Sequence, residues 1–169
     1  VSLGPEMRST GEVLGVGNNM DEAIFKGLLG AKRVHLIQDR KILVTIRDKD
    51  KEEFLPIAKS LVKHGSTLFA TKGTQKFLAE NGVESTLVNR IGEQSPNIND
   101  VLKDREVDLL INTPTKANDA QRDGFKMRRM AIEYGVDVLT SLDTINAILR
   151  MQDSHIDESK LEVFDVSKI

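Results

Sequence analysis

The run Leu68-Phe69-Ala70-Thr71-Lys72-Gly73-Thr74 joins a short apolar segment to two hydroxyls, a lysine and a glycine. Residues 75–80 follow with a helical pattern, so the run predicts a strand, a tight turn and the amino end of a helix. Backbone N–H groups and the positive end of the helix dipole gather at such a turn and favour an anion. The two threonines also suit simple helix capping, and spacing alone does not separate these interpretations.

The alternation of strand and helix extends over residues 41–151. Five apolar segments of strand length are separated by helical stripes, at residues 42–46, 68–70, 85–88, 108–111 and 136–140. The connections suit only helical crossovers between parallel strands. We therefore predict an α/β fold: a doubly wound five-stranded parallel sheet with helices on both faces, preceded by a short helical segment.

Helical spacing and cap residues mark the expected helices, which cover residues 20–29, 54–62, 75–80, 98–103, 120–134 and 142–151. An asparagine precedes the first helix and Ser141 precedes the last, as caps do. Pro56 fits its helix only if it lies in the first turn. Residues 34–37 and 161–166 could each add a short extended segment.

The composition is that of an ordinary globular protein, with 169 residues, 39% hydrophobic and 30% charged, and a net charge of −2. This charge and the scarcity of aromatic residues give no indication of nucleic-acid binding. The absence of cysteine excludes disulfides and thiolate chemistry, and the three histidines, far apart in sequence, predict no metal site. We find no membrane-spanning stretch and no signal peptide, and expect a cytoplasmic location.

Polar and basic side chains follow each expected strand. Since the carboxyl ends of parallel strands meet at one edge, these loops should lie together and form a ligand site. Amides, hydroxyls and cations dominate them, which favours a phosphorylated small ligand. The loops hold residues 49–51, 71–74, 89–90, 112–116 and 140–141.

No catalytic group stands out in these loops. Asp50 is the main acid at a strand tip, and it better suits a helix cap than a general base. Arg122, Lys126 and Arg129 fall near one helix face, which is more typical of a solvated surface than of an anion site. The sequence thus predicts a binding site without catalytic residues and without a metal.

Two stretches resemble a known family. Residues 4–17, Gly-Pro-Glu-Met-Arg-Ser-Thr-Gly-Glu-Val-Leu-Gly-Val-Gly, closely resemble the segment that closes the second ATP-grasp half of carbamoyl-phosphate synthetase large subunits. Residues 70–74, 88–90 and 111–113, in that order, resemble the C-terminal methylglyoxal-synthase-like regulatory domain of the same subunits. The resemblance covers roughly residues 1–151.

The resemblance implies a division into four parts. Residues 1–33 would be the tail of the synthetase half, 34–40 a linker, 41–151 the regulatory domain and 152–169 a C-terminal tail. The ATP-grasp machinery is absent from these residues, so the chain alone should not be an enzyme and should hold no cofactor. The parent ligase would use ATP with Mg or Mn and K to make carbamoyl phosphate for pyrimidine and arginine biosynthesis. Its partners would be the rest of the large subunit and the glutaminase small subunit, and homo-oligomers stay open.

The family's regulatory domains bind UMP and IMP, and the resemblance carries this effector site onto matching positions here. The expected effector-binding residues are Lys51, Thr71, Lys72, Gly73, Thr74, Asn89, Arg90, Asn112, Thr113 and Thr115. Thr140 matches a threonine that contacts ornithine in the family, although the acidic partners of that ligand would lie outside this chain.

Several positions depart from the family pattern. Lys72 replaces a usual histidine, Arg90 a frequent lysine and Pro114 a frequent threonine, for which Thr115 could substitute. Methylglyoxal synthases, which share the fold, carry a catalytic Gly-Gly-Asp motif after the third strand, and residues 92–98 lack it. A lyase acting on triose phosphate is therefore the second hypothesis, and a structural oligomerisation module without effector is the third.

Overall fold

The computed structural model describes residues 13–114, 118–154, 156, 159, 161–163 and 165. The first nine residues of the motif at 4–17 and the predicted site residue Thr115 lie outside this part of the chain. The chain divides into two compact units, one of Leu36–Asn146 and one of Val1–His35 with Ala147–Ile169. No helix in the described part of the chain is both long and apolar enough to cross a bilayer.

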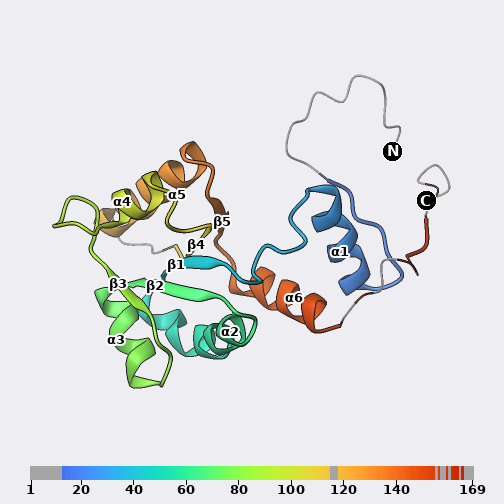
Figure 1. Cartoon of the computed structure of the whole chain (residues 1–169), viewed down its shortest axis with the longest axis horizontal. Helices are drawn as coiled ribbons and strands as arrows, with labels where there is room; N and C mark the ends of the chain where they lie inside the picture. The colour runs from blue at the N-terminus through green and yellow to red at the C-terminus, as the bar shows by residue number, and fades with distance from the viewer. Residues whose placement is uncertain are drawn as a thin grey trace. The chain divides into compact units, whose positions relative to one another are not determined.

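The larger unit is built on a five-stranded sheet in which every pairing is parallel (Figure 1). The strand order is β3-β2-β1-β4-β5, so the chain winds outward from β1 in one direction and then in the other. The strands are β1 Lys41–Thr45, β2 Thr67–Thr71, β3 Thr86–Val88, β4 Leu109–Asn112 and β5 Asp137–Leu139. The predicted doubly wound sheet is confirmed, with strand ends within a residue or so of those expected.

Helices cover both faces of this sheet. Figure 1 shows α2 and α3 on one face and α4 and α5 on the other. The helices are α1 Met20–Gly30, α2 Lys51–Lys63, α3 Lys72–Glu80, α4 Ile98–Lys103, α5 Asn118–Glu133 and α6 Leu142–Asp153, and a 3₁₀ helix, η1, covers Asp48–Asp50. The predicted caps at the first and last helices are present, since Asn19 Oδ1 accepts from Glu22 N and Ser141 Oγ accepts from Thr144 N.

Three local predictions are wrong. Pro56 lies in the second turn of α2 at an exposed position, and without an N–H it cannot donate to the carbonyl of the exposed Glu52 four residues earlier. Residues 34–37 form turns and bends, although Leu36 and Ile37 are buried. Residues 161–163 and 165 form no strand, and residues 164 and 166 of that expected segment lie outside the described part of the chain.

The apolar core follows the alternation of the central strands. Leu43 of β1 and Leu110 of β4 point to the face covered by α4 and α5, where they pack with Val101, Met127 and Ala131. The intervening residues of β1 are equally buried on the opposite face, because side chains alternate along a strand. The central strands are thus covered on both faces, whereas Leu87 of the edge strand β3 is exposed. In such a sheet the ends of the strands are the expected place for ligands.

The smaller unit contains α1 and the segment before it, and glycines decide their packing. A Cβ on Gly15 would lie 2.0 Å from the carbonyl oxygen of Ala23, and one on Gly17 would lie 2.6 Å from the Ala23 nitrogen. The two backbones can therefore meet only because these positions lack side chains. Lys26 Nζ and Asn18 Nδ2 also donate to Glu162, at 2.6 and 3.1 Å.

We predict that Gly15→Ala weakens this packing and Gly27→Ala does not. The added methyl at Gly15 overlaps backbone and should cost about 1–3 kcal/mol. Gly27 lies inside α1 and a Cβ there meets nothing closer than 4.0 Å, so alanine should add up to about 1 kcal/mol of helix propensity. Hydrogen exchange of the α1 amides measures both. Equal protection in the two variants would contradict the close approach.

Candidate functional site

Several of the predicted site residues lie at the carboxyl edge of the sheet. The switch in winding direction falls between β1 and β4, and ligands of doubly wound sheets bind at such points. The register places Thr45 beside Asn112, and Val44 beside Ala70. The ends of β1, β2 and β4, with Lys51, Thr71, Lys72, Gly73, Thr74, Asn112 and Thr113, therefore form one contiguous edge.

Thr74 is built into the framework of this edge. Its side chain is buried, and its hydroxyl accepts from Ile46 N at 3.2 Å and donates to Ile46 O at 3.5 Å. Thr71 stands at the N-cap of α3, but its side chain makes no capping hydrogen bond. The interpretation of both threonines as caps is therefore wrong, because Thr74 bonds to Ile46, just after β1, and the Thr71 side chain makes no capping bond. The first-turn N–H groups of α3 keep no side-chain cap.

Lys51 contacts the first turn of α3. Its ammonium donates to the Gly73 carbonyl at 2.9 Å, pairs with the Asp48 carboxylate at 2.7 Å and lies 5.9 Å from the centre of the Phe77 ring. Its side chain is only 15% exposed, whereas that of Asp48 is 95% exposed. The hydrogen bond and the charge of Lys51 lower the pKa of Asp48.

Asn112 joins three elements at the switch point. Its Nδ2 donates to Thr45 Oγ1 at 2.7 Å, and its Oδ1 accepts from Arg128 Nη1 of α5 at 2.5 Å. The residue is buried. With one end of the amide held by a hydroxyl and the other by a guanidinium, its orientation is fixed.

Arg47 and Thr113 complete the centre of the edge. The buried Thr113 hydroxyl accepts from Arg47 N at 2.9 Å. The Arg47 guanidinium pairs with Asp50 and donates to the Pro114 carbonyl at 2.9 Å. The expectation that Asp50 caps α2 is wrong: it occupies the N-cap position but makes no capping hydrogen bond, because its carboxylate binds Arg47.

The outer predicted residues are less tightly placed. Asn89 Nδ2 donates to Gln94 O within the loop after β3, and Arg90 is exposed beside it. Lys72 is exposed in the first turn of α3, and Thr140 is exposed after β5. These side chains are available to a ligand, but the described contacts do not join them to the central group.

Sequence reasoning missed Arg47 and Arg128 as parts of the edge. It placed cations on α5 but grouped Arg122, Lys126 and Arg129 instead. Lys126 and Arg129 are indeed exposed, and Arg129 pairs with Glu133. A signal for Arg128 was present, because Gly124, Met127, Arg128 and Ala131 fall at the i, i+3, i+4, i+7 spacing of a buried helix face.

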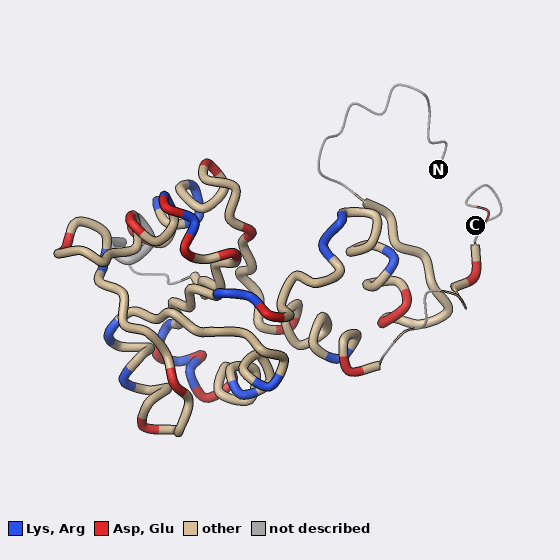
Figure 2. Tube along the Cα trace, in the orientation of Figure 1, with Lys and Arg blue, Asp and Glu red and all other residues tan. Residues whose placement is uncertain are grey.

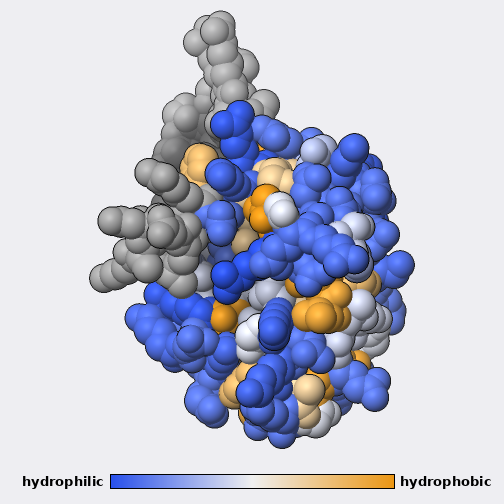
Figure 3. Space-filling view, turned by 90° about the vertical axis from the view of Figure 1, so that its left-hand side faces the viewer, coloured by the Kyte–Doolittle hydropathy of each residue, from blue (hydrophilic) through white to orange (hydrophobic). Residues whose placement is uncertain are grey.

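The charges of the edge are local rather than part of a basic face. Figure 2 shows Lys and Arg interspersed with Asp and Glu throughout the larger unit. Figure 3 faces the left-hand side of Figure 1, toward which β1 and β2 run, and shows a largely hydrophilic surface with small, separate apolar groups. No group of side chains suited to a metal ion occurs among the residues that the structure describes.

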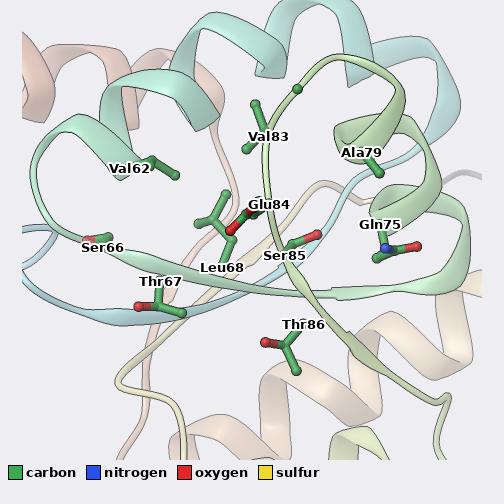
Figure 4. A pocket seen from close by; sticks show the side chains of 11 residues that line it. Val62, Ser66, Thr67, Leu68, Gln75, Ala79, Val83, Glu84, Ser85 and Thr86 are labelled. Carbon is green, nitrogen blue, oxygen red and sulfur yellow. The ribbon is translucent and has the colours of Figure 1, made fainter.

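A separate hollow of about 760 Å³ lies at the opposite, amino end of β2 and β3. Figure 4 shows Val62, Leu68, Val83 and Glu84 around it. Its lining contains no lysine or arginine, and the Ser85 hydroxyl is buried there without a partner in the described structure. The side chains of this hollow therefore offer an anion no positive charge.

A family model described as "MGS-like domain" matches residues 53–140, just over half of the chain. The chain belongs to the MGS-like domain family. The match spans α2 to the loop after β5, and so covers the edge from Thr71 to Thr140.

Curated relatives agree with this membership. The chain is 53% identical over 166 residues to the carbamoyl phosphate synthase large chain of Clostridium perfringens, and 53% identical over 169 residues to that of Clostridium botulinum. The alignments cover 98% and 99% of this chain but only 16% of each relative. The chain thus spans about a sixth of the length of the relatives it matches, and the predicted resemblance to these large subunits is confirmed.

A solved structure supports the fold. Methylglyoxal synthase from Elizabethkingia anophelis superposes with a TM-score of 0.52, covering 66% of this MGS-like chain and 78% of that one. The two sequences share 23% identity, so this likeness establishes the common fold and no activity.

We predict that Thr74→Val destabilises the domain while Thr71→Val does not. Valine at position 74 keeps the shape but leaves the buried N–H and C=O of Ile46 without partners, which should cost about 1–3 kcal/mol. Thr71 makes no capping bond, so its substitution should change the free energy of unfolding by less than about 0.5 kcal/mol. Urea unfolding compares the two, and equal losses would refute the special role of Thr74.

The Asp48–Lys51 pair gives a pH-dependent prediction. Because folding lowers the pKa of Asp48, the stabilisation by this pair is complete above the ordinary aspartate pKa of about 3.9 and is lost as the pH falls through the lower, folded value. Lys51→Met should raise the pKa of Asp48 toward its ordinary value, and Lys49→Met, on the same turn but exposed, should not. Carboxyl NMR titration measures this. An unchanged Asp48 pKa in Lys51→Met would show that the pair does not form in solution.

Proposed function

We propose that this MGS-like domain is an allosteric module that binds a phosphorylated nucleotide of the UMP or IMP type at the carboxyl edge of its sheet. The observation that carries the proposal is the grouping of Lys51, Arg128 and the uncapped amino end of α3 around the switch point. Backbone donors, a helix dipole and two cations together favour an anionic group. Asn112 and Thr45 supply neutral hydrogen-bonding groups suited to a ribose or base.

The module would act within a carbamoyl phosphate synthase large chain. The identity of 53% over nearly the whole chain supports this assignment. The synthesis of carbamoyl phosphate, with ATP, Mg or Mn and K, would belong to the remainder of that protein, together with a glutaminase subunit. This chain would contribute regulation and no catalysis, with Thr140 as a contact for an ornithine-type effector.

Regulation would follow from linkage between the nucleotide and the rest of the large chain. An effector shifts the equilibrium between two conformational states of a protein only to the extent that it binds one state more tightly than the other. The edge joins loops from β1, β2 and β4 through single side chains, so a ligand that moves Asn112 or Thr74 would change contacts on several elements at once.

A lyase function has less support. The loop after β3 contains one carboxylate, Glu93, which accepts a hydrogen bond from Arg90 N. The next acid, Asp100, lies in the first turn of α4 and accepts from Asn97 N in a capping box. Neither offers the free aspartate that a base in this loop would require.

We predict saturable binding of UMP or IMP to the 169-residue chain in isothermal titration. The dissociation constant should rise when the salt concentration is raised from about 0.05 to about 0.3 M, because the phosphate contact is ionic. Uridine and inosine, which lack the phosphate, are the matched controls and should bind far more weakly. Binding of the nucleosides as tightly as the nucleotides would refute a phosphate site, and silence with all four ligands would refute the effector proposal for this chain.

A further inference from the structure

We infer that Arg128 supplies the decisive positive charge of the effector site and at the same time orients Asn112 within it. The inference rests on the proposed function and concerns how the anion is held. It identifies a guanidinium on α5 as the anion-binding group, and it predicts a bound ligand with phosphate or comparable oxyanion chemistry.

The cations at the centre of the edge differ in how their charge is compensated. Lys51 pairs with Asp48, and Arg47 pairs with Asp50. Arg128 contacts a neutral amide oxygen, that of Asn112, and no carboxylate of the described residues lies within ion-pair distance of it. Of these three cations, Arg128 therefore retains the most uncompensated charge for an incoming anion.

The position of Arg128 strengthens the attraction between its charge and an anion. Arg128 is partly buried, whereas Lys72 and Arg90 are exposed and screened by solvent. One guanidinium N–H serves Asn112, and the planar fork keeps further donors that can bind two oxygens of a phosphate together. A partly buried guanidinium that has no carboxylate partner among the described residues is costly to keep unless a ligand compensates its charge.

Gly124 makes room for this arrangement one turn earlier on α5. The residue is buried, and a Cβ there would lie 3.2 Å from Arg128 Nη1 and 3.5 Å from Asn112 Oδ1. The guanidinium and the amide thus pack against the bare backbone of the helix. Met127, buried beside them, lies 3.8 Å from Thr45 Oγ1 through its sulfur and anchors this turn of α5 on the sheet.

The experiment titrates the full 169-residue chain with UMP, with IMP and with inorganic phosphate alone, by calorimetry at two salt concentrations. Arg128→Gln removes the charge but keeps a side chain that can donate to Asn112. Arg128→Lys keeps the charge but loses the fork. Arg129→Gln is the matched control, since Arg129 is the next residue, exposed and paired with Glu133.

We expect Arg128→Gln to weaken nucleotide binding about 10- to 100-fold and to flatten its salt dependence, because one ionic contact is lost. Arg128→Lys should retain the salt dependence with a smaller loss of affinity, and Arg129→Gln should bind as the parent chain does. Circular dichroism and thermal unfolding establish that each variant is folded. Should Arg128→Gln prove unstable, Gly124→Ala, which crowds the guanidinium without changing charge, provides the second test and should weaken binding at unchanged net charge.

Two outcomes would overturn the inference, and both are distinct from failure of the proposed function. Parental affinity and salt dependence in folded Arg128→Gln would show that Arg128 does not hold the anion. Equal losses in Arg128→Gln and Arg129→Gln would show a general effect of net charge. The absence of nucleotide binding by the parent chain would instead refute the effector proposal itself.

Discussion

Beyond the end of β1 the backbone is still buried but no longer paired within the sheet. Its N–H and C=O groups therefore need other hydrogen-bond partners. Ile46 is buried, and its N–H and C=O are met by the hydroxyl of Thr74 from α3. The next N–H, that of Arg47, is met by the hydroxyl of Thr113, beyond β4. Buried backbone donors need such partners, and here they come from the neighbours on both sides of β1. The carboxyl edge is therefore held together by side chains that bond to backbone.

This constraint explains why the edge is polar and yet held by specific side-chain contacts. A purely apolar edge could not satisfy these groups, and a hydrated one would not hold the three strand ends in register. The hydrogen bonds of Thr74, Thr113 and Asn112 hold this edge together. The charged side chains around them differ in their partners. Lys51 and Arg47 are paired with nearby carboxylates, while Arg128 is joined to the framework through the neutral amide of Asn112.

Periodicity and cap residues were sufficient to predict the strands, most helix ends and the fold class, because burial on a two-faced sheet imposes these patterns directly. The strand-end rule was likewise sufficient to predict that Lys51, Thr74 and Asn112 would lie at one edge. The hydrogen-bond and ion-pair partners of each side chain could not be predicted from the sequence. Asp50 could cap α2 or pair with Arg47 three residues earlier, and the spacing fits both. The helical spacing on α5 indicates that Arg128 lies on the buried face, but it does not identify Asn112 as its partner.

The pairing of Lys51 has a consequence for any anion that binds beside α3. Its ammonium already holds the Gly73 carbonyl and the exposed carboxylate of Asp48. An anion that recruits Lys51 must compete with Asp48, so part of its binding energy is used to loosen η1 at the start of α2. An anion held by Arg128 breaks no ion pair of the described residues and leaves η1 in place. Ligands that divide their contacts differently between these two cations would thus favour different arrangements of the β1–α2 connection, which is the differential affinity that regulation by two effectors requires.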